Sequence, residues 1–145
     1  MNDQPETKSV TGETRGRESA CIRVLIVDDL ARVRRGLRTI LQLADGLEVV
    51  GEAANGREAV QMAEQLNPDV VVMDLEMPEL DGFEATRQIK RRHLARAVVV
   101  LTIHGHDDAR ERAARAGADA FVEKATAVES LIETIRQAGN REVQT

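Results

Sequence analysis

Short apolar segments alternate with helical patterns along this chain, and that alternation restricts its fold more than any other feature. The apolar segments cover residues 22–27, 47–53, 70–73, 97–101 and 120–122. Those at 22–27, 70–73 and 97–101 are almost continuous apolar runs, which are typical of central strands covered on both faces. A helical pattern follows each segment, so the chain contains five βα units. Strict alternation of this kind predicts an α/β fold with a doubly wound parallel sheet.

Apolar residues at helical spacing and polar end signals mark the helices. The spacing predicts helices across residues 30–41, 55–66, 83–89, 107–116 and 126–135. Asn55 followed by Glu58 is typical of an N-cap with its partner, and Thr126 with Glu129 predicts a capping box at the last helix.

A polar residue stands at or just beyond the carboxyl end of four of the predicted strands. The first strand runs into Asp28 and Asp29, and the third runs into Asp74. Thr102 follows the fourth strand, and Lys124 lies just beyond the fifth. Because the ligand site of an open parallel sheet lies beyond the carboxyl ends of its strands, we expect these side chains to meet in one crevice.

The residue types in such a crevice suggest phosphoryl transfer onto a carboxylate. Carboxylates packed together repel one another and raise each other's pKa unless a cation neutralises them. Mg²⁺, which favours carboxylates together with water and phosphate oxygens, suits the three acids of this chain. A lysine and a threonine hydroxyl beside them can stabilise the charge that develops on a phosphoryl group.

Composition and charge allow one small domain. The chain has 145 residues, one cysteine and a net charge of -5. That charge argues against unspecific binding to nucleic acids or membranes, since both surfaces are anionic. No apolar run approaches the roughly 18 residues that span a bilayer, and the amino terminus carries no signal-peptide core. We therefore expect a cytoplasmic protein.

The two ends of the chain differ in composition from its middle. Residues 1–20 are rich in charge, Thr, Gly and Ser and show no apolar periodicity, which predicts a disordered polar tail. Residues 21–139 should form the folded domain. The polar residues 140–145 should form a C-terminal tail or the start of a linker.

Residues 22 to about 138 resemble the receiver domain of two-component response regulators. The resemblance rests on the strand that ends in Asp28-Asp29, the stretch VVVMDLEMPELDGFE around Asp74, the strand VVVLT that ends at Thr102, and GADAFVEK, which ends at Lys124. These motifs occur in the order of the family. The resemblance implies the flavodoxin-like receiver fold, with five strands in the order 2-1-3-4-5.

By this resemblance Asp74 would accept a phosphoryl group from a histidine kinase or a phosphotransfer protein. Asp29 and Asp74 would bind Mg²⁺ directly, together with the backbone carbonyl of Glu76. Asp28 would act on the ion mainly through water. Such a domain catalyses only its own phosphorylation and dephosphorylation, so we expect no other enzymatic activity.

The resemblance also implies a switch. Thr102 and Lys124 would bind phosphoryl oxygens, and Phe121 stands where the family places its switch aromatic residue. Movement of Thr102 toward the phosphoryl group would let the Phe121 ring turn inward and change the neighbouring surface. That surface would bind a downstream protein or a second copy of the chain. A phenylalanine has no hydroxyl to hydrogen-bond, so this switch should depend on packing alone.

The sequence departs from the common pattern of the family directly after Lys124. Ala125 stands where many members have a proline, and His104 lies two residues after Thr102. Both features resemble the subfamily whose full-length members carry a helix-turn-helix output domain. His104 and His106 also suggest a transition-metal site, but histidines in such a loop are more often solvated.

Other hypotheses for the whole chain stay open at this stage. The chain is either a regulator that acts through protein contacts or the receiver portion of a longer DNA-binding regulator, and these residues should not bind DNA themselves. An adaptor of receiver fold that binds partners without phosphorylation is a further hypothesis. A phosphatase with an aspartate nucleophile is less well supported, because Asp74 lies after the third strand and no cap insertion is visible.

Individual residues also have simpler interpretations. Asp28 and Asp29 are candidates for caps of the first helix, and Lys124 for a solvated lysine beside a helix. Arginines give the first helix a basic flank, which is either solvated or docks an acidic partner: Arg32, Arg34, Arg35 and Arg38.

Overall fold

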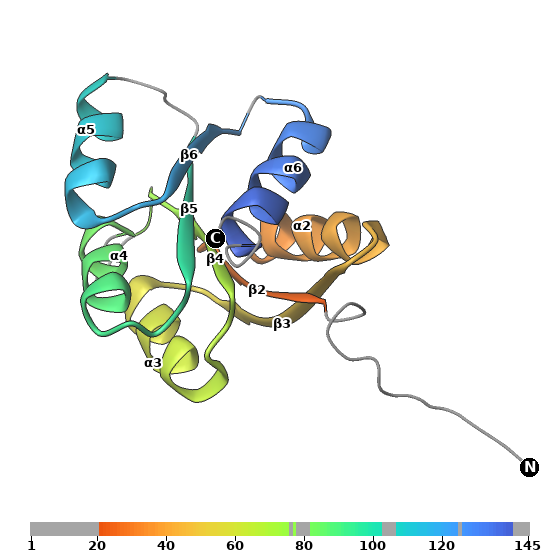
Figure 1. Cartoon of the computed structure of the whole chain (residues 1–145), viewed down its shortest axis with the longest axis horizontal. Coiled ribbons are helices and arrows are strands. Elements are labelled where there is room, and N and C mark those ends of the chain that lie inside the picture. The colour runs from red at the N-terminus through yellow and green to blue at the C-terminus, as the bar shows by residue number, and fades with distance from the viewer. Residues whose placement is uncertain (1–20, 76, 78–81, 103–106, 125, 141–145) are drawn as a thin grey trace, which may run out of the picture.

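Five parallel strands form one sheet at the centre of the protein (Figure 1). The structure is a computed structural model, and it describes residues 21–75, 77, 82–102, 107–124 and 126–140. The strands are β2 (Ile22–Val27), β3 (Leu47–Ala53), β4 (Val70–Asp74), β5 (Ala97–Thr102) and β6 (Ala120–Glu123). Their order across the sheet is β3-β2-β4-β5-β6. Counted along the chain this is 2-1-3-4-5, so the predicted fold is confirmed.

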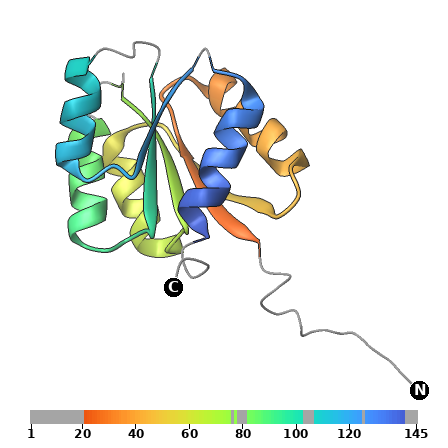
Figure 2. The same cartoon turned by 45° about the horizontal axis from the view of Figure 1, so that its top comes forward.

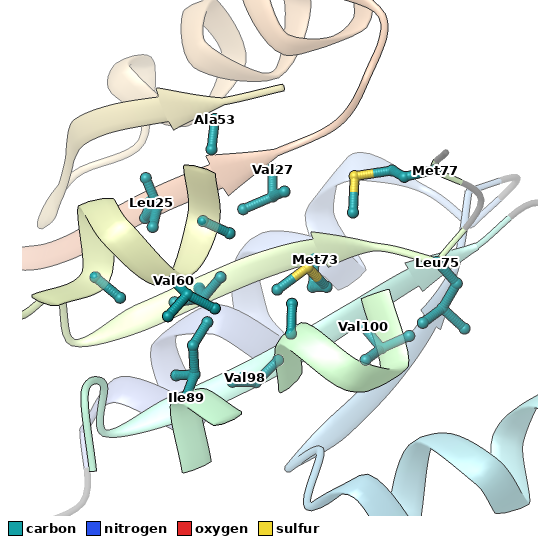
Figure 3. Close-up of a cluster of buried hydrophobic side chains, with 14 of the residues drawn as sticks. Leu25, Val27, Ala53, Val60, Met73, Leu75, Met77, Ile89, Val98 and Val100 are labelled. Atoms are coloured by element: carbon teal, nitrogen blue, oxygen red, sulfur yellow. The ribbon is translucent and has the colours of Figure 1, made fainter. Parts of the chain in front are cut away.

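Helices cover both faces of the sheet. They are α2 (Ala31–Leu43), α3 (Gly56–Leu66), α4 (Gly82–Arg91), α5 (Asp107–Ala116) and α6 (Val128–Gly139). Figure 2 shows α2 and α6 on one face and α3, α4 and α5 on the other. Buried side chains accordingly form two clusters, one on each side of the sheet. Figure 3 shows the cluster beneath α3 and α4, with Val27, Met73 and Val100 at its centre.

Two of the three inner strands, β4 and β5, are buried along their whole length. Every residue of β4 and β5 is buried, which agrees with their continuous apolar sequences. Both strands run slightly beyond the predicted bounds: β4 ends at Asp74 and β5 at Thr102. The polar residues at these ends are therefore fixed by the ladder itself, because Asp74 pairs with Leu101 and Thr102 with Glu123.

One of the two predicted helix caps is confirmed. The backbone N–H of Glu58 donates to Oδ1 of Asn55 at 2.9 Å, so Asn55 caps α3. The prediction of a capping box at α6 was wrong. The N-cap of α6 is Ala127, without a side-chain hydrogen bond, and Thr126 instead donates its N–H to the Glu123 carbonyl at 2.9 Å. This turn after β6 places the threonine one residue too early to cap the helix.

The first strand and the last helix meet at the amino edge of the sheet, opposite the polar strand ends (Figure 2). Gly139 closes α6 directly against Ile22 of β2 and Val70 of β4. A Cβ atom on Gly139 would lie 2.7 Å from Cγ2 of Ile22 and 3.0 Å from Cγ2 of Val70. A side chain at this position would therefore separate the last helix from the sheet.

None of the helices in the described part of the chain combines the length and the apolar character that a membrane span requires.

Candidate functional site

Polar side chains from four strands meet at the carboxyl edge of the sheet. Asp28 follows β2, Asp74 ends β4, Thr102 ends β5 and Lys124 follows β6. Asp28, Asp74 and Thr102 are almost completely buried, with exposed fractions of 1%, 2% and 0%. Buried polar groups are costly unless they are paired, so this cluster is unusual in an otherwise apolar sheet.

The ammonium group of Lys124 bridges two of the buried carboxylates. Its Nζ lies 3.2 Å from Oδ2 of Asp28 and 3.4 Å from Oδ1 of Asp74. The Lys124 side chain is 21% exposed, so it reaches the carboxylates from the rim of the site. It is therefore a member of the cluster, and its interpretation as a solvated lysine was wrong.

The two carboxylates keep Lys124 charged. Burial by itself would lower the pKa of Lys124, but the negative charges of Asp74 and Asp28 outweigh burial. The pKa of Lys124 is consequently raised above its ordinary value. A fixed positive charge thus stands beside Asp74, where it can stabilise negative charge on a group bound to that carboxylate.

Asp29 completes an acidic cluster with Asp28 and Asp74. Each of the three residues offers a carboxylate oxygen, and these oxygens all lie within 4.8 Å of one another. Asp28 and Asp74 are buried, whereas Asp29 faces solvent. Mg²⁺ takes oxygen ligands and keeps several waters, so a cluster of carboxylates that opens to solvent on one side fits this ion.

Three further hydrogen bonds fix Asp28, two through its main chain and one through its carboxylate. Its N–H donates to the Ala53 carbonyl at 3.1 Å, and its Oδ1 accepts from the N–H of Leu30 at 2.9 Å. Its carbonyl accepts from the guanidinium of Arg34 at 2.7 Å. The N-cap position of α2 is Leu30, whose own side chain makes no capping hydrogen bond, so neither Asp28 nor Asp29 occupies the N-cap position. Both carboxylates belong to the acidic cluster with Asp74.

Arg34 and Arg38 belong to a second group of charges, which the sequence analysis missed. Nε of Arg34 lies 3.1 Å from Oε1 of Glu52, and Nη1 of Arg38 lies 2.7 Å from Oε2 of the same residue. Hydrogen bonds from Arg38 and Arg34 lower the pKa of Glu52, although burial opposes them. These two arginines therefore connect α2 to β3, and through Arg34 to the Asp28 turn. They do not form a freely solvated basic flank.

Phe121 of β6 lies beside α5. It is the residue of β6 that pairs with Val100 of β5, and its ring packs against the cluster on the α3–α5 face. The side chain is only partly buried. The guanidinium of Arg110 on α5 lies over the ring, with Cζ 4.4 Å from its centroid. The sequence alone does not indicate this partner of the ring.

Several residues named in the sequence analysis lie outside the described residues. They are Glu76, with its proposed carbonyl ligand, His104, His106 and Ala125. The same holds for residues 1–20 and 141–145.

Comparisons with a family model and with individual proteins agree that this chain is similar to response regulators. The family model of the response regulator receiver domain matches residues 24–136. The chain is similar to the response regulator GacA of Pseudomonas aeruginosa, with 41% identity over 122 residues, which is 83% of this chain and 57% of that protein. It is 48% identical over 105 residues to a protein-glutamate methylesterase/protein-glutamine glutaminase of Alkalilimnicola ehrlichii, covering 71% of this chain but 27% of that protein.

Solved structures agree with the sequence comparisons. The response regulator domain of Thermotoga maritima CheB superimposes with a TM-score of 0.76 and 37% identity, covering 83% of this chain and 97% of that one. A DNA-binding response regulator of the LuxR family from Staphylococcus aureus gives a TM-score of 0.77 and 30% identity, covering 82% and 99%.

Proposed function

Because the chain belongs to the response regulator receiver family, whose model matches residues 24–136, we propose that it is a phosphorylation-controlled switch. Asp74 is the acceptor of the phosphoryl group. One observation carries this proposal: a buried carboxylate ends a central strand, with two further acids and a lysine ammonium gathered around it. A carboxylate that served only to cap or turn the chain would not need these neighbours.

The reaction is nucleophilic attack by a carboxylate oxygen of Asp74 on phosphorus. The bond between phosphorus and a histidine nitrogen of the donor breaks, and its electron pair stays on the imidazole. Lys124, held beside Asp74 by its ion pairs, neutralises charge on the transferred group. Thr102, buried at the end of the neighbouring strand, offers its hydroxyl to a phosphoryl oxygen.

Magnesium fits the acidic cluster and is part of this proposal. Asp29 and Asp74 would hold the ion, with the backbone carbonyl of Glu76, and Asp28 would act mainly through water. Bound Mg²⁺ would screen the negative charge of Asp74 from that of the incoming phosphoryl group. The solvent-facing position of Asp29 supports this assignment, since it leaves room for waters on the ion.

The partners follow from this chemistry. The phosphoryl donor is a histidine kinase or a phosphotransfer protein, and the changed surface beside Phe121 binds a downstream protein or a second copy. The chain modifies only itself, and the activity of its methylesterase relative is not assigned to it, because the match covers 27% of that protein. A receiver within a longer regulator would use the same site, and we place the switch in the cytoplasm.

Intact mass tests the proposal. The protein is incubated with acetyl phosphate in the presence and absence of Mg²⁺, beside the variants Asp74→Asn and Asp45→Asn. Asp45 is an exposed carboxylate in the turn before β3 and serves as the matched control. We expect one phosphoryl adduct that requires Mg²⁺ and Asp74 and persists in Asp45→Asn.

The absence of a phosphoryl adduct would contradict the proposal. A folded protein that gains no adduct from acetyl phosphate or from a phosphorylated histidine kinase would refute the phosphorylation switch. Binding of partners without Mg²⁺ or phosphorylation would then favour the adaptor.

A further inference from the structure

We propose that Arg110 is a positioning residue for the switch: its guanidinium holds the Phe121 ring in its partly exposed position and so opposes the response to phosphorylation. This inference rests on the proposed function and deepens it. The sequence alone predicts a ring held by packing only, because phenylalanine has no hydroxyl. The structure supplies an electrostatic contact in place of that hydroxyl.

The first observation is that α5 places a guanidinium over each aromatic ring of the chain. The chain has two phenylalanines and no tyrosine or tryptophan. Arg110 covers Phe121, and Arg112 covers Phe83 of α4 at 4.0 Å from Cζ to the ring centroid. A cation within about 6 Å of a ring centroid is attracted by the ring quadrupole. Helix α5 is thus connected to β6 by one such contact and to α4 by another.

The second observation is that, among the described residues, α5 brings only small apolar side chains to the core. Its buried residues are Ala113 and Ala116, which bring a small apolar area to the core. Burial stabilises in proportion to apolar area, so two alanines contribute far less than the leucines and isoleucines of other helices. The two arginine contacts are therefore a large part of what positions this helix.

The third observation is the space beside the contact. A hollow of about 170 Å³ is lined by Arg110, Phe121, Asp119 and four alanines of α5, β6 and the turn between them. Small side chains and open space let the ring and the guanidinium separate without a clash. The position of the ring is consequently decided by the guanidinium contact more than by steric confinement.

The ring is also connected to the site through the strand ladder. Phe121 pairs with Val100, and two residues further along each strand Thr102 pairs with Glu123. Lys124 follows directly, and its N–H donates to the Thr102 carbonyl at 2.7 Å. A shift of the strand end at Thr102 would therefore be passed to the backbone that carries Phe121.

Three variants test the role of Arg110. Arg110→Met keeps an unbranched side chain and removes its charge, Arg110→Lys keeps a cation, and Arg112→Met is the matched control on the other ring. Both positions are exposed on α5, and circular dichroism verifies the fold. Protein labelled with ¹³C only in phenylalanine gives ring signals from two residues, so both contacts can be followed in one spectrum.

The measurement is the beryllium fluoride concentration that gives half of the change in the Phe121 signals, with Mg²⁺ present. Beryllium fluoride binds carboxylates as a mimic of a phosphoryl group. When the responsive state is a minor one, apparent affinity is proportional to its population. Loss of an exposed cation–π contact should therefore lower the half-effect concentration about two- to fivefold in Arg110→Met. We expect Arg110→Lys to lie between this variant and the wild type, and Arg112→Met to move the Phe83 signals without changing the half-effect concentration.

Two results would overturn the inference. One is an Arg110→Met protein with the half-effect concentration of the wild type, and the other is an equal shift in Arg112→Met, which would indicate general loosening of α5. Failure of the proposed function would look different. In that case Asp74 of the wild type would gain no adduct by mass, and neither ring would respond to beryllium fluoride.

Discussion

Substitution of Gly82 by alanine would push a methyl group into the backbone that carries the phosphoacceptor. Gly82 is the first residue of α4, and an ideal Cβ atom there would lie 2.5 Å from the carbonyl oxygen of Asp74. It would also lie 3.1 Å from Cα of Leu75. Neither neighbour is the flexible end of a side chain. Either α4 or the end of β4 must therefore move.

The cost follows from two opposing effects. Overpacking a rigid site costs about 1–3 kcal/mol. Alanine gains up to about 1 kcal/mol over glycine in a helix, and less at a first residue. Because β4 is buried along its whole length, it cannot move easily. The cost of the clash should therefore exceed the gain in helix preference. We expect Gly82→Ala to destabilise the protein by roughly 1–2 kcal/mol.

Gly36→Ala is the matched control. Gly36 lies in the middle of α2 on its exposed side, and no atom would lie within 4 Å of a Cβ there. Only the helix preference of alanine remains, so this variant should be stabilised by about 0.5–1 kcal/mol. The same substitution should thus have opposite signs at the two positions.

Urea denaturation measures both variants. With slopes of about 1–3 kcal/mol per molar urea, the midpoint should fall by roughly 0.5–1 M in Gly82→Ala and rise by a few tenths in Gly36→Ala. Phosphorylation by acetyl phosphate should slow only in Gly82→Ala, because only that methyl group displaces Asp74. A Gly82→Ala protein as stable and as reactive as the wild type would refute the reasoning.

Three further substitutions test the polar groups of the structure. Lys124→Met should destabilise the protein by about 2 kcal/mol, since Asp28 and Asp74 lose a shared ammonium, and Mg²⁺ should recover part of the loss in a thermal melt. Glu52 has a lowered pKa, so the stability from its ion pairs is fully present above its usual value of 4.5 and is lost as the pH falls through the lowered pKa. Glu52→Gln should therefore cost about 1 kcal/mol at neutral pH and almost nothing in strong acid, and an equal difference at both would contradict this assignment. Thr86 is fully buried, and its hydroxyl has no hydrogen-bond partner among the described residues. Thr86→Val should therefore raise the unfolding free energy by up to about 1 kcal/mol. A lower unfolding free energy in this variant would indicate that the hydroxyl has a partner.

The strands and the site were predictable because their signals are local. Continuous apolar runs define β4 and β5, and the polar residue after each run must lie at the carboxyl edge of a parallel sheet. Asp28, Asp74 and Lys124 could therefore be placed together from the sequence, and the structure brings them within ion-pair distance. Their roles in phosphoryl transfer remain predictions.

The contacts that the sequence did not reveal depend on register and on helix rotation. Arg34 reaches the Asp28 carbonyl and Glu52 only because α2 packs beside β3 in one particular alignment. The ladder between β2 and β3 also shifts register between Val24 and Leu25, which no local pattern signals. The predicted capping box at Thr126 was wrong for a related reason, because the N–H of Thr126 donates to Glu123 in the turn after β6.

The contact of Gly139 with Ile22 and Val70 has a consequence for protein engineering. It brings the start of β2 and the end of α6 to one place, on the edge of the sheet away from the acidic cluster. Domains whose ends lie close together tolerate insertion into a loop of another protein. This fold could therefore be grafted into a host loop as a single cassette, with the acidic cluster at the opposite ends of the strands, away from the host.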